Sequence, residues 1–340
     1  MRTMLVTGGA GFIGANFVRF VLRHREDWRI VNLDALTYSG NLENLADVQE
    51  NSRYRFVRGD IRDADLTGRL ASEADLVVHM AAESHVDRSI MDSAPFIQTN
   101  VGGTQALLDA VRRAGRASRF LYVSTDEVYG SLALEDRDAR FTEETPLAPN
   151  SPYAASKAGG DLLCRAYHHT FGMDVVTTRC SNNFGPYQFP EKVIPLFVTN
   201  LLEGKRVPLY GDGLNVRDWL HVDDHCEAIL AVAERGRSGE VYNVGGNNER
   251  SNLELTRSIL GLMGCGHEMI QHVADRPGHD RRYAIDAGKI ERELGWRPSR
   301  SAWPGALRDT VEWYRTNRAW WQRVRSGEYR EYYERQYGAR

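Results

Sequence analysis

Two adjacent acids near the middle of the chain could serve as a general acid and a general base. Asp126 and Glu127 follow Thr125 and an apolar run, residues 120–123, that predicts a buried parallel strand. In an open α/β sheet, ligands bind outside the carboxyl ends of the strands. Because burial and mutual repulsion raise carboxyl pKa values, one acid can stay protonated while the other remains a base. The alternative is a solvated turn without a catalytic role.

A tyrosine and a lysine with helical spacing form a second candidate pair. Ser151 and Pro152 are suited to the N-cap and first position of a helix. That helix would place Tyr153 and Lys157 one turn apart on the same face. A nearby ammonium favours the phenolate, so it should lower the pKa of Tyr153 toward the range in which tyrosine removes a hydroxyl proton. The spacing is common by chance and gains its meaning from the nucleotide-binding signature that precedes it.

A glycine-rich turn near the N-terminus predicts a dinucleotide site. Gly8, Gly11 and Gly14 lie between an apolar strand, residues 4–6, and a segment of helical period, residues 15–22. This arrangement brings backbone N–H groups and the positive end of a helix dipole to a pyrophosphate. Asp34 ends the next strand, residues 29–34, and follows Gly14 by 20 residues. A carboxylate there meets the adenine ribose hydroxyls and repels a 2′-phosphate, so NAD is favoured over NADP.

Two further strands, residues 55–57 and 75–80, should end at the same edge of the sheet. After the first strand, Asp60 and Ile61 would flank adenine. After the second, the small Ala81 and Ala82 would allow the cofactor to approach closely. A long helix is expected from Pro95 to about Ala114. Asn100 within it is a poor helix former, which hints at a polar role, although a solvent-facing side chain is the commoner explanation.

Composition and charge narrow the class of protein. The chain has 340 residues, 42% of them hydrophobic, and its 43 basic and 46 acidic residues give a net charge of −3. No basic stripe suggests nucleic acid or membrane, so a small-molecule partner is favoured. The chain has four cysteines, Cys164, Cys180, Cys226 and Cys265. They are too widely spaced for a zinc site or a redox dithiol. No signal-peptide core or 18-residue apolar stretch is found, so we expect a cytoplasmic protein.

Four motifs together carry a family resemblance. T-G-G-A-G-F-I-G, A-A-E-S-H-V-D-R-S, S-T-D-E-V-Y-G and Y-A-A-S-K resemble the extended short-chain dehydrogenase/reductase superfamily, and within it most closely the dTDP-glucose 4,6-dehydratases. The similarity extends from Gly8 to about Trp313. The Asp126–Glu127 pair is specific to these dehydratases, because the sister sugar-nucleotide epimerases carry small or hydroxyl residues there.

The resemblance implies a redox-neutral lyase of deoxysugar biosynthesis. Such an enzyme converts dTDP-glucose to dTDP-4-keto-6-deoxyglucose and water: tightly held NAD takes hydride from C4, water leaves across C5 and C6, and the hydride returns to C6. Tyr153, aided by Lys157 and Thr125, would remove the C4 hydroxyl proton. Glu127 would take the C5 proton, and protonated Asp126 would donate to the departing C6 hydroxyl.

The motifs and the resemblance together imply two sets of binding residues. For the cofactor these are Gly8, Gly11, Phe12, Ile13, Gly14, Asp34, Thr37, Asp60, Ile61, Ala81, Ala82, Thr99, Tyr153, Lys157 and Asn182. For the nucleotide sugar they are Ser84, Thr125, Asn183, Lys192, Val193, Ile194, Pro195, Pro208, Tyr210, Arg217, Asn243, Arg276 and His279. Two arginines are the expected chemistry for a diphosphate, although without the resemblance either could be an ordinary surface residue.

These elements predict a Rossmann-like, doubly wound parallel sheet with a smaller mixed α/β C-terminal domain. The NAD domain should span residues 1–180, with residues 215–245 returning to it, and residues 181–340 should mainly bind the nucleotide sugar. Residues 179–195 are expected to be mainly loop, followed by helix to Leu202. The aromatic tail, residues 320–337, should pack over the smaller domain. The superfamily also implies a homodimer with a four-helix interface built from the helices that begin at Pro95 and Pro152.

Three alternatives remain at this stage. His221 and His225 have the spacing of a helical zinc pair, but Val222 replaces the glutamate of the metalloprotease pattern, so a helix start capped by Asp223 is favoured. A nucleotide-sugar 4-epimerase is disfavoured by the acid pair. A non-catalytic NAD-sensing regulator is disfavoured because the tyrosine, the lysine and both acids are intact.

Overall fold

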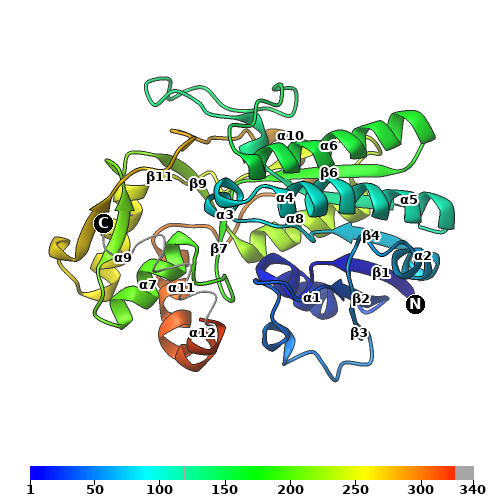
Figure 1. Ribbon diagram of the computed structural model, residues 1–340, viewed down its shortest axis with the longest axis horizontal. Helices are drawn as coiled ribbons and strands as arrows, with labels where there is room; N and C mark the ends of the chain where they lie inside the picture. The colour runs from blue at the N-terminus through cyan, green and yellow to red at the C-terminus, as the bar shows by residue number, and fades with distance from the viewer. Residues whose placement is uncertain (118, 326–340) are drawn as a thin grey trace.

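The centre of the protein is a seven-stranded, entirely parallel sheet (Figure 1). The structure is a computed structural model and describes residues 1–117 and 119–325. The strands follow the order β10-β6-β5-β4-β1-β2-β3. Their bounds are β1 Arg2–Thr7, β2 Trp28–Asp34, β3 Tyr54–Arg58, β4 Leu76–His79, β5 Arg119–Thr125, β6 Val175–Cys180 and β10 Val241–Val244. The strand order reverses between β1 and β4, which is where such sheets bind ligands.

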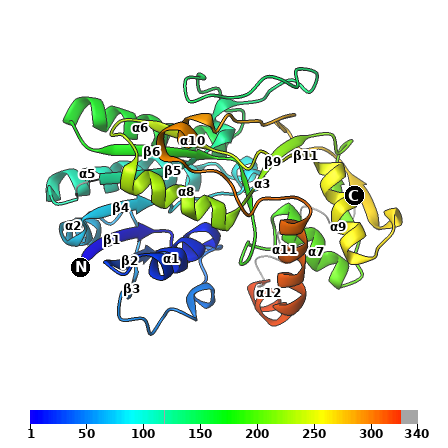
Figure 2. The same ribbon diagram turned by 180° about the vertical axis from the view of Figure 1, so that it is seen from behind.

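Helices cover both faces of this sheet, as the apolar strands require. One face carries α1 Phe12–His24, α8 Val222–Arg235 and α10 Gly288–Leu294. The other carries α2 Ala64–Glu73, α5 Thr104–Ala114 and α6 Pro152–Phe171. Figures 1 and 2, which show opposite sides, display α6 and α5 over one face and α8 over the other. The predicted doubly wound α/β class is thus confirmed.

The helix predicted from Pro95 is interrupted by a π-helical segment. It consists of α4 Ala94–Phe96, the π segment η2 Ile97–Gly103 and α5, and it is preceded by α3 Val86–Met91. Asn100 lies in the π segment and is 1% exposed. Its side chain accepts from the Glu83 N–H at 2.9 Å and donates to the Glu83 carbonyl at 2.9 Å and to Ser156 Oγ at 2.8 Å. Asn100 therefore has a buried polar role, which is to hold the loop that follows β4.

The C-terminal part of the chain is mixed α/β, as expected. A three-stranded sheet joins β7 Asn182–Phe184, β9 Val216–His221 and β11 Glu249–Ser251, and a pair joins β8 Val207–Tyr210 and β12 Ile270–Val273. Its apolar core lies among α7 Val193–Leu202, α9 Asn252–Met263, α11 Gly305–Thr316 and α12 Arg318–Val324. Short 3₁₀ turns are η1 Leu42–Leu45, η3 Asp126–Tyr129 and η4 His267–Met269. The segment predicted as loop contains β7, because residues 182–184 pair in parallel with β9.

Some later segments lie with the first sheet. β10 extends the sheet beyond β6, α8 packs against α1, and α10 packs against β10. The exact division into two domains stays a prediction. Trp320 and Trp321 of the aromatic tail lie in α12 within the C-terminal core. The rest of that tail, residues 326–337, lies outside the described residues.

The histidine pair at the start of α8 is used for local structure. The helix begins after His221, whose Nδ1 accepts from the Asp223 N–H at 3.2 Å, so the predicted Asp223 cap is wrong and the cap is His221. His225 Nδ1 forms a 2.9 Å hydrogen bond with Asn183 Oδ1. Within residues 1–117 and 119–325, no group of three or more His, Cys, Asp or Glu side chains is placed to hold a metal ion. In the same ranges, no helix is long and apolar enough to cross a membrane.

Candidate active site

A deep cavity lies along the carboxyl ends of the central strands. All fifteen residues predicted to bind the cofactor line it, as do all five predicted catalytic residues and Ser84, Asn183 and Lys192 of the predicted substrate set. These residues come from the carboxyl ends of β1 to β5 and the segments that follow them, from α1, η2, α6 and β7, and from the segment before α7. The parallel sheet therefore brings together residues that are up to about 180 positions apart in the sequence.

The glycine turn forms one wall of this cavity. Gly8 has a φ of +75°, and a Cβ there would lie 2.7 Å from Ala81 Cα, while a Cβ on Gly14 would lie 2.2 Å from the Gly8 carbonyl oxygen. A Cβ on Gly11 would meet only that same oxygen, at 3.4 Å, and no side chain caps the start of α1. The open side of Gly11 and the uncapped N–H groups of a 13-residue helix fit a pyrophosphate.

Asp34 is held rigidly at the end of β2. Its Oδ2 accepts from the Ala10 N–H and its Oδ1 from the Leu36 N–H, both at 2.8 Å, and the residue is 8% exposed. Burial raises the pKa of Asp34, and the two N–H donors oppose this rise. A carboxylate has about four acceptor positions, so lone pairs remain for the two hydroxyls of a ribose.

Asp126 is buried and Glu127 is half-buried, which excludes the solvated-turn alternative. Asp126 is 1% exposed; its Oδ2 has no partner, and its Oδ1 accepts from Thr125 Oγ1 at 3.4 Å. Burial, and then the charge of Glu127, raises the pKa of Asp126 well above its usual range. Burial also raises the pKa of Glu127, but Arg276 and Arg217 oppose that rise. The surroundings therefore favour a protonated Asp126 beside an ionised Glu127.

Tyr153 and Lys157 lie on one face of α6, whose start is fixed because Ser151 Oγ accepts from the Ala154 N–H at 3.1 Å. Lys157 Nζ donates to the Val123 carbonyl at 2.7 Å, and burial lowers its pKa to about 8. The predicted lowering of the Tyr153 pKa is not found. Burial, and then the charge of Glu127, raises the pKa of Tyr153 well above its usual value.

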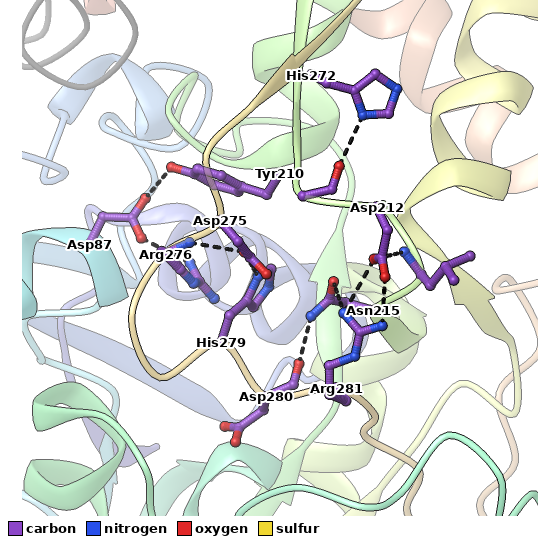
Figure 3. A network of polar contacts seen from close by, with 12 residues as sticks. Asp87, Tyr210, Asp212, Asn215, His272, Asp275, Arg276, His279, Asp280 and Arg281 are labelled. Carbon is purple, nitrogen blue, oxygen red and sulfur yellow. Dashed lines mark hydrogen bonds and ion pairs between the residues drawn. The ribbon is translucent and has the colours of Figure 1, made fainter. Parts of the chain in front are cut away.

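A polar network that includes Arg276 adjoins the cavity (Figure 3). Asp87, from α3, accepts from Arg276 Nη1 at 3.0 Å and from the Tyr210 hydroxyl at 3.1 Å. His279 Nδ1 and Asp275 Oδ1 are 2.6 Å apart. The C-terminal loop that carries Arg276 is thus tied to the N-terminal part of the protein. These residues lie outside the cavity lining, although the charge of Arg276 acts on Glu127.

Arg217 is buried rather than a surface residue. It is 5% exposed, its Nη2 donates to the Asp280 carbonyl at 2.9 Å, and its guanidinium lies 4.1 Å from the centre of the Tyr283 ring. Its charge also opposes the rise in the Glu127 pKa. A contact between Arg217 or Arg276 and a diphosphate stays a prediction, as do the roles of Val193, Pro195, Pro208, Tyr210 and His279.

Two predicted substrate residues are fully buried. Ile194 is 0% exposed and belongs to the apolar core of the C-terminal part. Asn243 is also 0% exposed, and its side chain accepts from the Tyr129 hydroxyl at 2.8 Å and donates to the Phe141 carbonyl at 3.1 Å. Contacts of Ile194 and Asn243 with the substrate stay predictions.

The cavity also has polar walls that the sequence analysis missed. Glu191 has no exposed side-chain surface, and its Oε2 accepts from Arg88 Nε at 3.1 Å. The Arg88 guanidinium lies 4.2 Å from the centre of the Tyr38 ring. Other unpredicted lining residues are Glu83, Gln98, Gln188 and Phe189. The sequence offers one signal for Glu83 and Glu191, which is that each directly precedes a predicted substrate residue, Ser84 or Lys192.

The sheet, the glycine turn and the Tyr153–Lys157 pair define an extended short-chain dehydrogenase/reductase. The family model of GDP-mannose 4,6 dehydratase matches residues 5–305. A dTDP-glucose 4,6-dehydratase of Streptomyces niveus is 55% identical over 327 residues, which cover 95% of this chain and 96% of the relative. The chain therefore belongs to the GDP-mannose 4,6 dehydratase family.

Solved structures agree with this assignment. DesIV, a dTDP-glucose 4,6-dehydratase of Streptomyces venezuelae crystallised with NAD, is 55% identical, with a TM-score of 0.91 and coverage of 95% of this chain and 99% of that one. A UDP-glucose 4-epimerase of Thermotoga maritima is similar at 29% identity, with a TM-score of 0.84 and coverage of 92% and 99%.

Proposed function

We propose that the protein converts dTDP-glucose to dTDP-4-keto-6-deoxyglucose and water, with NAD as a tightly bound cofactor. The relatives at about 55% identity carry the name of this activity, and the solved relative DesIV binds NAD. The observation that carries the proposal is the pair formed by buried Asp126 and half-buried Glu127, which lines the same cavity as Tyr153. Only an elimination needs a positioned acid and a positioned base in addition to the tyrosine.

The residues of the cavity divide the reaction between them. When bound, NAD supplies the acceptor for the hydride from C4, and its reduced form supplies the donor of that hydride to C6. Tyr153 accepts the proton of the C4 hydroxyl as a phenolate, with Thr125 beside it, so the Lys157 ammonium must offset the rise in the Tyr153 pKa that burial and Glu127 cause. Glu127 removes the C5 proton, which the C4 ketone makes acidic, and returns it to C5 when hydride reaches C6. Asp126, whose pKa is raised by burial, gives its proton to the leaving C6 hydroxyl.

The test of this proposal is mass spectrometry of a reaction that contains only the purified protein and dTDP-glucose. A product lighter by one water, formed without added NAD, is the expected result. A product of unchanged mass but inverted C4 would instead indicate a 4-epimerase, the activity named for the relatives near 29% identity. Absence of any turnover by protein that retains NAD would favour the non-catalytic regulator.

Asp34→Asn is expected to weaken NAD binding about tenfold to a hundredfold, because hydrogen bonds to a charged acceptor are worth roughly 1.5–3 kcal/mol. NADP affinity should fall less or rise, since the carboxylate no longer repels the 2′-phosphate. Titration calorimetry of the cofactor-free protein with both nucleotides measures the ratio. Asp65→Asn is the control, because Asp65 is exposed and does not line the cavity. Equal losses of affinity for NAD and for NADP would indicate that Asp34 acts by holding the chain after β2 in place, not by contacting the ribose.

We expect a homodimer in solution. Large apolar side chains are exposed on the helices named for the interface, with Ile97 49%, Leu162 55% and Phe171 48% exposed. Exposed apolar side chains on both of these helices suit burial against a second copy of the chain in a four-helix interface. Analytical ultracentrifugation at micromolar concentration should give twice the chain mass. Leu162→Glu should shift the protein toward monomer, whereas Leu214→Glu, on another exposed apolar residue, should not.

A cytoplasmic location is part of the same proposal. The four cysteines are all unpaired, and three of them are buried. Free thiols persist in reducing compartments, whereas secreted proteins tend to pair them.

A further inference from the structure

A buried chain of hydrogen bonds links the last described helix to the glycine turn. Trp320 of α12 donates its indole N–H to Asn44 Oδ1 at 2.9 Å, and Asn44 Nδ2 donates to the Ala10 carbonyl at 2.9 Å. Trp320 is 7% exposed and Asn44 is 2% exposed. α12 lies opposite α1 in both views of the fold (Figures 1 and 2). α12 therefore contacts the N-terminal part of the protein directly.

The residues around Ala10 belong to the wall of the cofactor cavity. The Ala10 carbonyl also accepts from the Asn41 N–H at 3.0 Å, and the Ala10 N–H donates to Asp34 at 2.8 Å. Between Asp34 and Asn41 the chain supplies five lining residues, which are Ala35, Thr37, Tyr38, Ser39 and Gly40. We call residues 35–41 the cofactor loop. Asn41 and Asn44 together fasten the end of this loop to the glycine turn.

A second set of contacts makes Asn44 a junction between the two parts of the protein. Arg19 donates to the backbone carbonyl of Asn44 and pairs with Asp47 at 2.8 Å. The Arg19 guanidinium lies 4.2 Å from the centre of the Tyr187 ring, which meets the Trp320 ring edge-on at 5.6 Å between centroids. The exposed pair between Arg323 and Glu43 adds little, because surface ion pairs are weak.

We propose that α12 braces the cofactor loop through Asn44 and so slows the release of NAD. This inference rests on the proposed function for the identity of the bound cofactor. A ligand enclosed by a loop leaves when that loop opens, and each buried hydrogen bond that spans the closed state lowers the population of the open state. Trp320 and Asn44 are then positioning residues, since neither lines the cavity.

The matched test compares two neighbouring tryptophans of α12. Trp320→Phe removes the hydrogen bond to Asn44, whereas Trp321→Phe removes a buried bond of equal length, 2.9 Å, to the Tyr314 carbonyl within the C-terminal core. Each protein is loaded with radiolabelled NAD and chased with excess unlabelled NAD. Trp320→Phe should release the label about two- to tenfold faster than wild type, as expected for one net hydrogen bond, and Trp321→Phe should release it at the wild-type rate.

A double variant separates a specific brace from general loosening. If Trp320 acts through Asn44, then Trp320→Phe added to Asn44→Ala should not accelerate release beyond Asn44→Ala alone. Equal acceleration by Trp320→Phe and Trp321→Phe, or additive effects in the double variant, would overturn the brace. So would a wild-type rate for Trp320→Phe. Wild-type protein that binds no NAD would instead contradict the proposed function.

Discussion

Replacing both acids, Asp126→Asn with Glu127→Gln, is expected to leave the first oxidation intact and to stop the reaction before water leaves. The amides preserve side-chain shape but cannot exchange protons, and losing a general acid or base typically costs about 10²–10⁴ in rate. Tyr153 can still accept the C4 proton. Reduced cofactor should therefore accumulate when substrate is added to NAD-loaded protein.

Stopped-flow absorbance at the reduced nicotinamide band measures this accumulation, and exchange of the C5 hydrogen with deuterated solvent measures the proton transfer by Glu127. Glu26→Gln with Asp27→Asn is the matched control, because it neutralises two adjacent acids, of which Asp27 is 55% exposed in its side chain. If the acid-pair variant formed no reduced cofactor, Asp126 and Glu127 would be acting in oxidation or in folding, and the division of roles would be wrong.

Tyr153→Phe is expected to fail one step earlier. Without the phenol, the C4 hydroxyl proton has no acceptor, so turnover should fall by about 10²–10⁴ and the cofactor should remain oxidised. The edge-on contact of the ring with Phe96, at 6.3 Å between centroids, is available to phenylalanine as well, so folding should be preserved.

The same stopped-flow measurement distinguishes the two variants. Tyr167→Phe is the control on the same helix, since its hydroxyl donates to Asp109 at 2.9 Å, away from the cavity. It should turn over like wild type. Rapid formation of reduced cofactor by Tyr153→Phe would remove the tyrosine from the oxidation step and assign that proton to another group.

The sequence by itself determined the fold class and the part of the cavity lining that is predicted to bind the cofactor. The signals there are local: the glycine turn spans residues 8–14, and the strands end at Asp34, Asp60 and Ala81 within a few residues of their apolar runs. Parallel strands bring those ends to one edge, so a local pattern suffices to place them. The family motifs added the acid pair and the Tyr153–Lys157 pair in the same way.

The tertiary structure decided what depends on distance through space. The side chains of Asn243 and Ile194 are fully buried, and burial, followed by Glu127, raises the pKa of Tyr153. The hydrogen bond between Trp320 and Asn44 joins residues 276 positions apart. Burial, electrostatics and long-range contacts arise only when distant segments pack together, and no spacing in the chain encodes which segments meet.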